Sequence, residues 1–175
     1  LLVGLLIQWG AREAKGHGVP QVLEAVAVGG ANIRARVAVV KSLASAVCLG
    51  SGGSAGREGP IVQIGSTLGS VSGRLIGGGL ARRRTFLACG AAAGIAATFN
   101  APLAGVLFAQ EIILGEFVIS SLAPIVVAAV TSAAIGYYAF GNVPAFEIPA
   151  YTLGNVSDLG WFLLLGGVTA VAGVF

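Results

Sequence analysis

Residues 117–140 form an apolar run that contains no charged side chain. A helix needs about 20 such residues to cross the roughly 30 Å hydrocarbon core of a bilayer, so this run is long enough. That core contains no water, and each backbone N–H and C=O of a spanning segment must find its hydrogen-bond partner inside the protein. The run therefore predicts a membrane-spanning α-helix.

The composition extends this prediction to the whole chain. Of 175 residues, 56% are hydrophobic and only 10% are charged, whereas soluble domains carry about a quarter charged residues. The chain also contains 28 glycines, and small residues let membrane helices approach one another closely. The expected fold class is an all-α, polytopic membrane protein.

The positive charge is distributed unevenly along the chain. The net charge is +3, and all ten Lys and Arg residues precede Thr85, mostly in short segments between apolar runs. This scattered arrangement does not suggest a nucleic-acid partner. By the positive-inside rule, the basic segments are expected on the cytoplasmic side, and the loop 141–160, which has no Lys or Arg, on the opposite side.

Residue types that bind metals are scarce. Cys48 and Cys89 lie in apolar segments, where a cysteine is most simply a buried free thiol. His17 is the only histidine and no paired cysteine spacing occurs, so neither a metal site nor a disulfide is expected. No cofactor is implied, and the chain is not expected to be an enzyme.

Residues 50–65, GSGGSAGREGPIVQIG, join a glycine-rich loop to a predicted helix start at Gly59–Pro60, because proline is favoured in the first turn of a helix. The first N–H groups of a helix have no intrahelical acceptor and lie at the positive end of its dipole, so they form an anion site. Glu58 places a fixed carboxylate where a free anion would bind. The expected anion-binding residues of this segment are Gly56, Arg57, Gly59, Pro60 and Ile61.

Gly50–Ala55 also fits the dinucleotide-binding pattern G-x-G-x-x-G/A. The preceding run is too long for a strand and contains a lysine, and no Asp or Glu follows about 20 residues later, as that site requires. A P-loop is excluded because no Gly-Lys-Ser/Thr follows.

A second break, GHGVP, precedes a segment that extends only to about Val28. This segment is too short to span a bilayer, and such half-length helices are tolerated at membrane depth only where protein or a water-filled cavity shields them. Many transporters aim the N-termini of broken helices at an anion. The expected anion-binding residues of this segment are Gly16, His17, Gly18, Val19 and Pro20.

The remaining apolar runs predict further helices, of which 60–76 carries a glycine at every fourth position and so a close-packing face. The other expected helices are 1–9, about 34–49, 85–99, 102–114 and one that begins at Trp161.

Three motifs, GHGVP, GREGPIVQIG and GAAAGIAATFNAPLAGVLFAQE, resemble the CLC family of chloride channels and chloride/proton antiporters in sequence, order and spacing. The resemblance covers the whole chain. It implies that residues 1–175 are a partial CLC membrane domain, from about helix C to helix J, within the first of two inverted repeats and without the second repeat or CBS domains. It also implies a homodimer with a pore in each subunit, embedded in the lipid bilayer as a multi-pass protein of the plasma or inner membrane.

The resemblance further assigns roles to individual residues. Glu58 matches the gating glutamate, whose carboxylate competes with the anion. His17 departs from the family, because many members have a serine here, in the segment that forms their anion selectivity filter. Glu111 matches the first of two adjacent acidic residues in antiporters and is a candidate for the proton path, but Ile112 stands where antiporters have the internal proton acceptor. These matches imply channel-like movement of chloride or a similar small anion.

Alternatives remain open at each of these positions. Glu58 could instead pair with Arg57 or cap the helix. His17 contributes either its ring or only its backbone N–H groups, and Glu111 either carries protons or is a structural partner. For the whole protein, the alternatives are a chloride/proton antiporter, a transporter of a larger solute, which no side-chain cluster favours, and a membrane scaffold that transports nothing.

Overall fold

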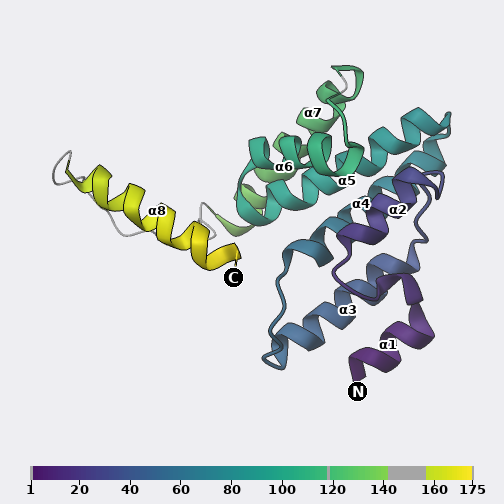
Figure 1. Ribbon diagram of the computed structural model, residues 1–175. Helices are drawn as coiled ribbons and strands as arrows, with labels where there is room; N and C mark the ends of the chain where they lie inside the picture. The colour runs from purple at the N-terminus through teal and green to yellow at the C-terminus, as the bar shows by residue number, and fades with distance from the viewer. Residues whose placement is uncertain (1, 118, 142–156, 175) are drawn as a thin grey trace. The chain divides into compact units, whose positions relative to one another are not determined.

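The computed structural model describes residues 2–117, 119–141 and 157–174, and every regular element within these ranges is helical (Figure 1). The all-α fold class is therefore confirmed. The elements are α1 Leu2–Gly10, the 3₁₀-helix η1 Arg12–Ala14, α2 Val19–Ala27, α3 Arg36–Gly50, α4 Glu58–Ile76, α5 Leu80–Phe99, α6 Pro102–Phe108, the π-helix η2 Ala109–Leu114, α7 Ile119–Phe140 and α8 Asp158–Val174.

Two antiparallel neighbours, α4 and α5, form the centre of the first compact unit, Leu1–Ala145. Their backbones meet at glycines, as the spacing in 60–76 predicts. A Cβ on Gly65 would collide with the carbonyl oxygen of Gly90, and a Cβ on Gly69 would collide with that of Phe86. Only glycine permits this approach, because any larger residue would force the two helices apart.

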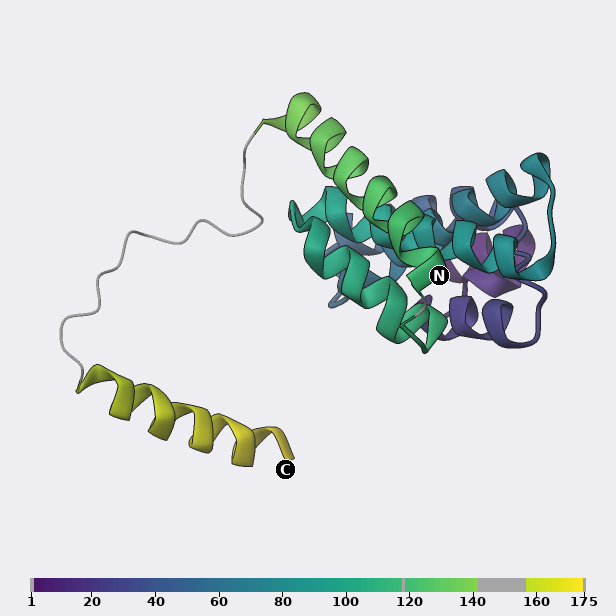
Figure 2. The same ribbon diagram turned by 90° about the horizontal axis from the view of Figure 1, so that it is seen from above.

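The other helices of this unit pack on the two sides of the α4–α5 pair. Helices α2 and α3 pack against α4, and α1 packs against α3, whereas α6, η2 and α7 pack against α5 (Figures 1 and 2). The second unit, Phe146–Phe175, contains α8, which is described here by itself.

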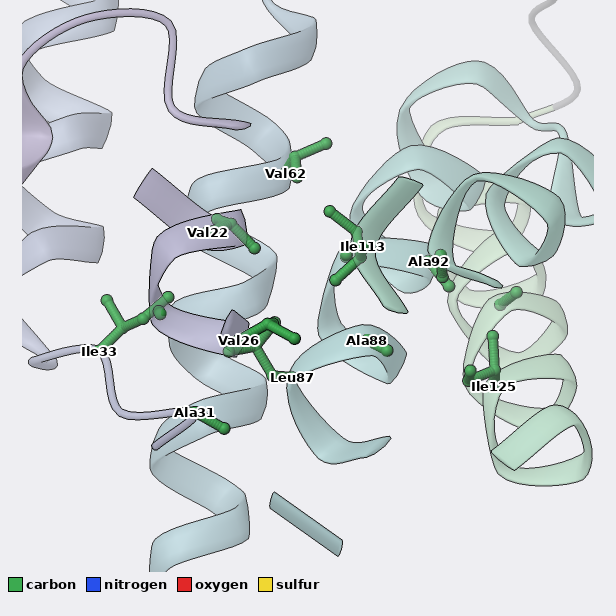
Figure 3. Close-up of a cluster of buried hydrophobic side chains, with 14 of the residues drawn as sticks. Val22, Val26, Ala31, Ile33, Val62, Leu87, Ala88, Ala92, Ile113 and Ile125 are labelled. Carbon is green, nitrogen blue, oxygen red and sulfur yellow. The ribbon is translucent and has the colours of Figure 1, made fainter. Parts of the chain in front are cut away.

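The buried core joins α2 to the central pair (Figure 3). Val22 and Val26 of α2 belong to the same buried cluster as Val62 of α4, Leu87 of α5 and Ile113 of η2. Complete burial of such a side chain stabilises a fold by about 1.5–3 kcal/mol. The short helix α2 is thus held by its buried face rather than by its length.

Two helix starts differ from the sequence prediction by three residues or more, and one predicted helix changes its winding. Helix α5 begins at Leu80 instead of Thr85 and includes Arg82–Arg84, because arginine is a good helix former and Arg84 Nε donates a 3.1 Å hydrogen bond to the carbonyl of Val26. Helix α8 begins at Asp158 instead of Trp161, while residues 142–156 of the predicted loop lie outside the described residues. The predicted helix 102–114 changes to π-helical winding at Ala109.

Among the described helices, α7 alone is long and apolar enough to cross a bilayer by its length and composition. It corresponds to the spanning helix that the apolar run 117–140 predicts. Its exposed face is apolar and includes Val127, Val130 and Ile135. Two shorter apolar stretches are Pro102–Leu114 and Asp158–Gly173.

Candidate functional site

The N-terminus of α4 presents free backbone donors. The helix begins at Glu58, with Pro60 as its third residue, one to two residues before the start at Gly59–Pro60 that the sequence predicts. The N–H groups of Glu58 and Gly59 precede the first possible intrahelical bond, and among the described residues they have no acceptor. The positive end of the α4 dipole therefore lies here.

The N-terminus of α2 is built on two glycines with positive φ. Gly16 has φ +83° and Gly18 has φ +113°, values that residues with a Cβ atom rarely adopt. The N–H of Gly18 donates a 3.0 Å hydrogen bond to Gln21 Oε1, and Pro20 has no N–H. The N–H groups of Gly16, His17 and Val19 have no backbone acceptor among the described residues.

The two N-termini touch each other through glycine. A Cβ on Gly18 would lie 2.7 Å from the carbonyl oxygen of Gly59 and 3.1 Å from Gln63 Oε1. A Cβ on Gly59 would lie 2.6 Å from His17 Nδ1 and would collide with the His17 carbonyl oxygen. The absence of side chains at Gly18 and Gly59 therefore allows two separate helix starts to share one site.

A cavity of about 450 Å³ opens at this junction. Four predicted residues line it, namely Gly16 and His17 from the α2 loop and Gly56 and Pro60 from the α4 start. The other lining residues, mostly small or apolar, are Val3, Ile7, Ala14, Lys41, Ala44, Ser45, Cys48, Leu49, Ser54 and Ala55.

The carboxylate of Glu58 folds back onto the glycine loop. Its Oε2 occupies the space that a Cβ on Gly56 would need. Glu58 is exposed and, among the described residues, makes no hydrogen bond or ion pair. The alternative pairing with Arg57 is not formed, because the Arg57 guanidinium instead lies 5.2 Å from the centroid of the Phe99 ring.

Lys41 is a charged residue of this cavity that the sequence prediction missed. Its side chain is only 4% exposed, and Nζ donates hydrogen bonds to the carbonyl oxygens of Ala14 (3.0 Å) and Gly16 (2.6 Å). The available signal was a lysine inside an apolar helical run, since ionisable residues at membrane depth are functional by default.

The loop before α2 is also fixed from α4. Gln63, which is buried, donates a 2.7 Å hydrogen bond from Nε2 to the carbonyl of Glu13. The Glu13 carboxylate pairs with Arg34, whose Nε lies 2.8 Å from Oε1. Burial raises the pKa of Glu13, but the hydrogen bond with Arg34 and the charges of Arg34 and Arg36 outweigh burial and hold the pKa below its ordinary value.

The predicted site residues therefore fall into two groups. In the first group, Gly16, His17, Gly56 and Pro60 line the 450 Å³ cavity, and Gly18 and Gly59 form the contact between the two helix starts. In the second, Arg57 faces Phe99, Ile61 lines an apolar cavity of about 750 Å³ between α4, α5 and α7, and Glu111 is exposed on η2. Within the described ranges, no three His, Cys, Asp or Glu side chains gather as metal ligands.

The family model for voltage-gated chloride channels matches residues 1–175. The chain belongs to the CLC family. It is 36% identical over 99% of its length to a putative ClcB-like chloride channel protein of Ralstonia nicotianae, of which it covers 41%. It is 37% identical over 94% of its length to the H⁺/Cl⁻ exchange transporter ClcA of Vibrio cholerae, of which it covers 36%.

Solved structures agree with this CLC assignment. The crystal structure of a slow cyanobacterial Cl⁻/H⁺ antiporter matches 98% of this chain with a TM-score of 0.82 and 26% identity. The chain covers 41% of that antiporter. It thus spans about two fifths of the length of these CLC relatives.

Proposed function

We propose that the protein containing this chain moves chloride or a similarly small anion across a membrane by channel-like conduction, with Glu58 as the gate. The observation that carries this proposal is the contact between the N-termini of α2 and α4 at one cavity. Two positive dipole ends and the buried cation Lys41 meet there, and all three favour an anion.

Backbone donors suit conduction because they bind an anion without the strength of a direct ion pair. A conducted ion must bind favourably enough to enter and weakly enough to leave. The unpartnered N–H groups of Glu58 and Gly59 can supply such binding. Lys41 donates two of its three N–H groups to backbone carbonyl oxygens.

Glu58 competes with the anion for the same helix N-terminus. Its ionised carboxylate occupies the space beside Gly56, next to the free N–H groups of α4. Protonation removes the negative charge and with it the attraction to the dipole. Acid on the side that Glu58 faces should therefore open the path.

The test is chloride flux from liposomes that contain the native full-length protein. We expect the flux to rise as the external pH falls, and Glu58→Gln to conduct rapidly at every pH. Glu24→Gln is the matched control, because Glu24 is an exposed carboxylate on α2 outside the 450 Å³ cavity. An unchanged pH response in Glu58→Gln would disprove the gate, and no flux in any form would favour the scaffold alternative.

The second candidate function is chloride/proton exchange. It is supported by the names of two similar proteins, the Vibrio cholerae exchange transporter and the cyanobacterial antiporter. Glu111 would then be the candidate for carrying protons from the cytoplasmic side. The channel proposal instead relies on Ile112. By the CLC resemblance, this position holds the acidic proton acceptor in antiporters, and isoleucine cannot carry a proton.

We also propose that the full-length protein is a homodimer and a multi-pass protein of the plasma or inner membrane. The CLC resemblance implies the dimer, and the family match together with α7, which is long and apolar enough to span a bilayer, supports the membrane location. Mass measurement of the purified protein in detergent tests the dimer.

A further inference from the structure

Two cavities share the basic side chains that follow α1. The first, which we call the α1 groove, has a volume of about 520 Å³ and is lined by Val3, Gly4, Ile7, Gln8, Arg12 and Lys15. The second, which we call the polar cavity, has a volume of about 890 Å³ and lies between the loop after α1, helix α2, the start of α3 and Gln63 of α4. Because Arg12 and Lys15 line both, one elongated ligand can contact the two cavities together.

The shared basic side chains are available to bind an anionic group. Arg12 and Lys15 are exposed, and neither side chain forms an ion pair or a hydrogen bond with the described part of the chain. Of the other charged groups that line the polar cavity, Glu13 is paired with Arg34, which leaves the two cations opposite the single carboxylate of Glu24. The excess positive charge favours an anion at Arg12 and Lys15.

The polar cavity also contains two buried acceptors that lack a donor. Gln63 is only 1% exposed, and its Nε2 donates to the Glu13 carbonyl, whereas its Oε1 has no hydrogen-bond partner among the described residues. Oε2 of Glu13 is likewise buried and unpartnered there. A buried acceptor without a hydrogen bond is unfavourable. A ligand that brings hydroxyl donors into the cavity would satisfy both oxygens.

The α1 groove has the opposite character, because Val3, Gly4 and Ile7 give it an apolar wall. It belongs to a helix with a single polar side chain, Gln8, and the first charged residue after that helix is Arg12. By the positive-inside rule, Arg12 and Lys15 are expected at the cytoplasmic surface of the bilayer. An acyl chain along α1 would therefore place its phosphate at the level of these two cations, and basic pockets between membrane helices on this side bind anionic headgroups.

We propose that this region binds one anionic phospholipid with a hydroxylated headgroup, such as phosphatidylglycerol. An acyl chain lies in the α1 groove, the phosphate lies between Arg12 and Lys15, and the glycerol hydroxyls donate to Gln63 Oε1 and Glu13 Oε2 in the polar cavity. The proposal does not rest on the proposed anion transport, since it concerns the side of α2 and its loop that carries Arg12 and Lys15 rather than the N-terminus of α4.

The test is native mass spectrometry of the purified full-length protein in detergent, titrated with phosphatidylglycerol. Phosphatidylmethanol with the same acyl chains carries the same charge but no hydroxyl group, so it should bind about fivefold more weakly, as the loss of one or two hydrogen bonds implies. Free glycerol 3-phosphate has the phosphate and the hydroxyls without acyl chains, and it should bind at least roughly 100-fold more weakly. These comparisons use the native protein and need no variant to fold.

The double variant Arg12→Gln/Lys15→Gln should bind phosphatidylglycerol about 10- to 30-fold more weakly, because each basic side chain near a membrane surface contributes separately. Arg36→Gln/Arg82→Gln is the matched control. It also removes two exposed basic side chains, but neither of them lines the α1 groove or the polar cavity, so its affinity should change by less than about threefold.

Four results would overturn the proposal. Equal weakening in the two double variants would show only a general attraction to the basic surface, and equal affinity for phosphatidylglycerol and phosphatidylmethanol would show that the polar cavity does not bind the headgroup. Equally tight binding of glycerol 3-phosphate would assign the site to a soluble phosphate ester. No binding of phosphatidylglycerol by the native protein is the result expected if another segment of the full-length protein fills the α1 groove.

Discussion

His17 lies directly against Gly59, at the point where the loop before α2 meets the first turn of α4. A Cβ on Gly59 would come within 2.6 Å of His17 Nδ1 and 2.7 Å of its Cε1. The loop that contains Gly16–Gly18 and the first turn of α4, which contains Glu58, are therefore in contact through their backbones. We therefore expect that a change in one of them disturbs the other.

The substitution Gly59→Ala should disturb this junction. Alanine favours a helix over glycine, but its Cβ would collide with the backbone oxygen of His17, which cannot move as freely as a side-chain tip. We expect a loss of about 1–3 kcal/mol in stability and a large loss of anion flux. Thermal unfolding and liposome flux measure both effects. Gly50→Ala is the control, since a Cβ there meets nothing within 4 Å; equal behaviour of the two variants would contradict the prediction.

The substitution His17→Ser should change anion selectivity or its pH dependence without abolishing transport. His17 lines the cavity, and histidine is the side chain that most readily changes charge near neutral pH. A cationic ring would favour anions, so the native protein should gain anion affinity in acid and the serine variant should not. Relative chloride, nitrate and fluoride fluxes between pH 5 and 8 provide the measurement. Identical profiles would show that only the backbone of His17 takes part.

Proton coupling should be absent if conduction is channel-like. Ile112 and Glu111 are both exposed on the π-helical turn of η2, but only Glu111 can titrate. We expect an imposed chloride gradient to drive no uphill proton movement in vesicles that contain the native protein. Observed pumping would replace the channel proposal with exchange, and its loss in Glu111→Gln would identify the proton carrier. In the absence of pumping, Ile112→Glu tests whether an added acid creates coupling.

The Glu13–Arg34 pair should make stability depend on pH in the acid range. The pKa of Glu13 is lowered in the folded state, so the unfolded chain binds a proton first as the pH falls. The stabilisation is complete above about pH 4.3, the ordinary glutamate value, and is lost as the pH falls through the lower folded pKa. Both side chains are partly exposed, at 39% for Glu13 and 58% for Arg34, so the contribution at pH 7 should be below about 1 kcal/mol.

Thermal unfolding of Glu13→Gln measures this contribution. The variant should be slightly less stable than the native protein at pH 7, and the difference should shrink towards pH 3. Glu24→Gln, which removes an exposed carboxylate outside any ion pair of the described chain, should show no such convergence. A difference that stays constant with pH would mean that the ion pair does not stabilise the fold.

The amino-acid sequence by itself determined the features that depend on neighbouring residues. The apolar run 117–140 predicts α7, and the prolines at 60 and 102 mark the starts of α4 and α6. The glycines spaced by four in α4 predict its close contact with α5. Composition, periodicity and the steric demands of proline and glycine act over a few residues, and the sequence displays them directly.

Only the tertiary structure decided which distant groups meet. Lys41 reaches the carbonyls of Ala14 and Gly16, Arg57 turns to Phe99 rather than to Glu58, and Arg84 extends α5 by bonding Val26. Each of these contacts joins segments far apart in the chain, and each forms only because several helices pack together. A lysine in an apolar run signals that a partner is needed, but the identity of that partner depends on which backbone the folded helices bring within hydrogen-bond distance.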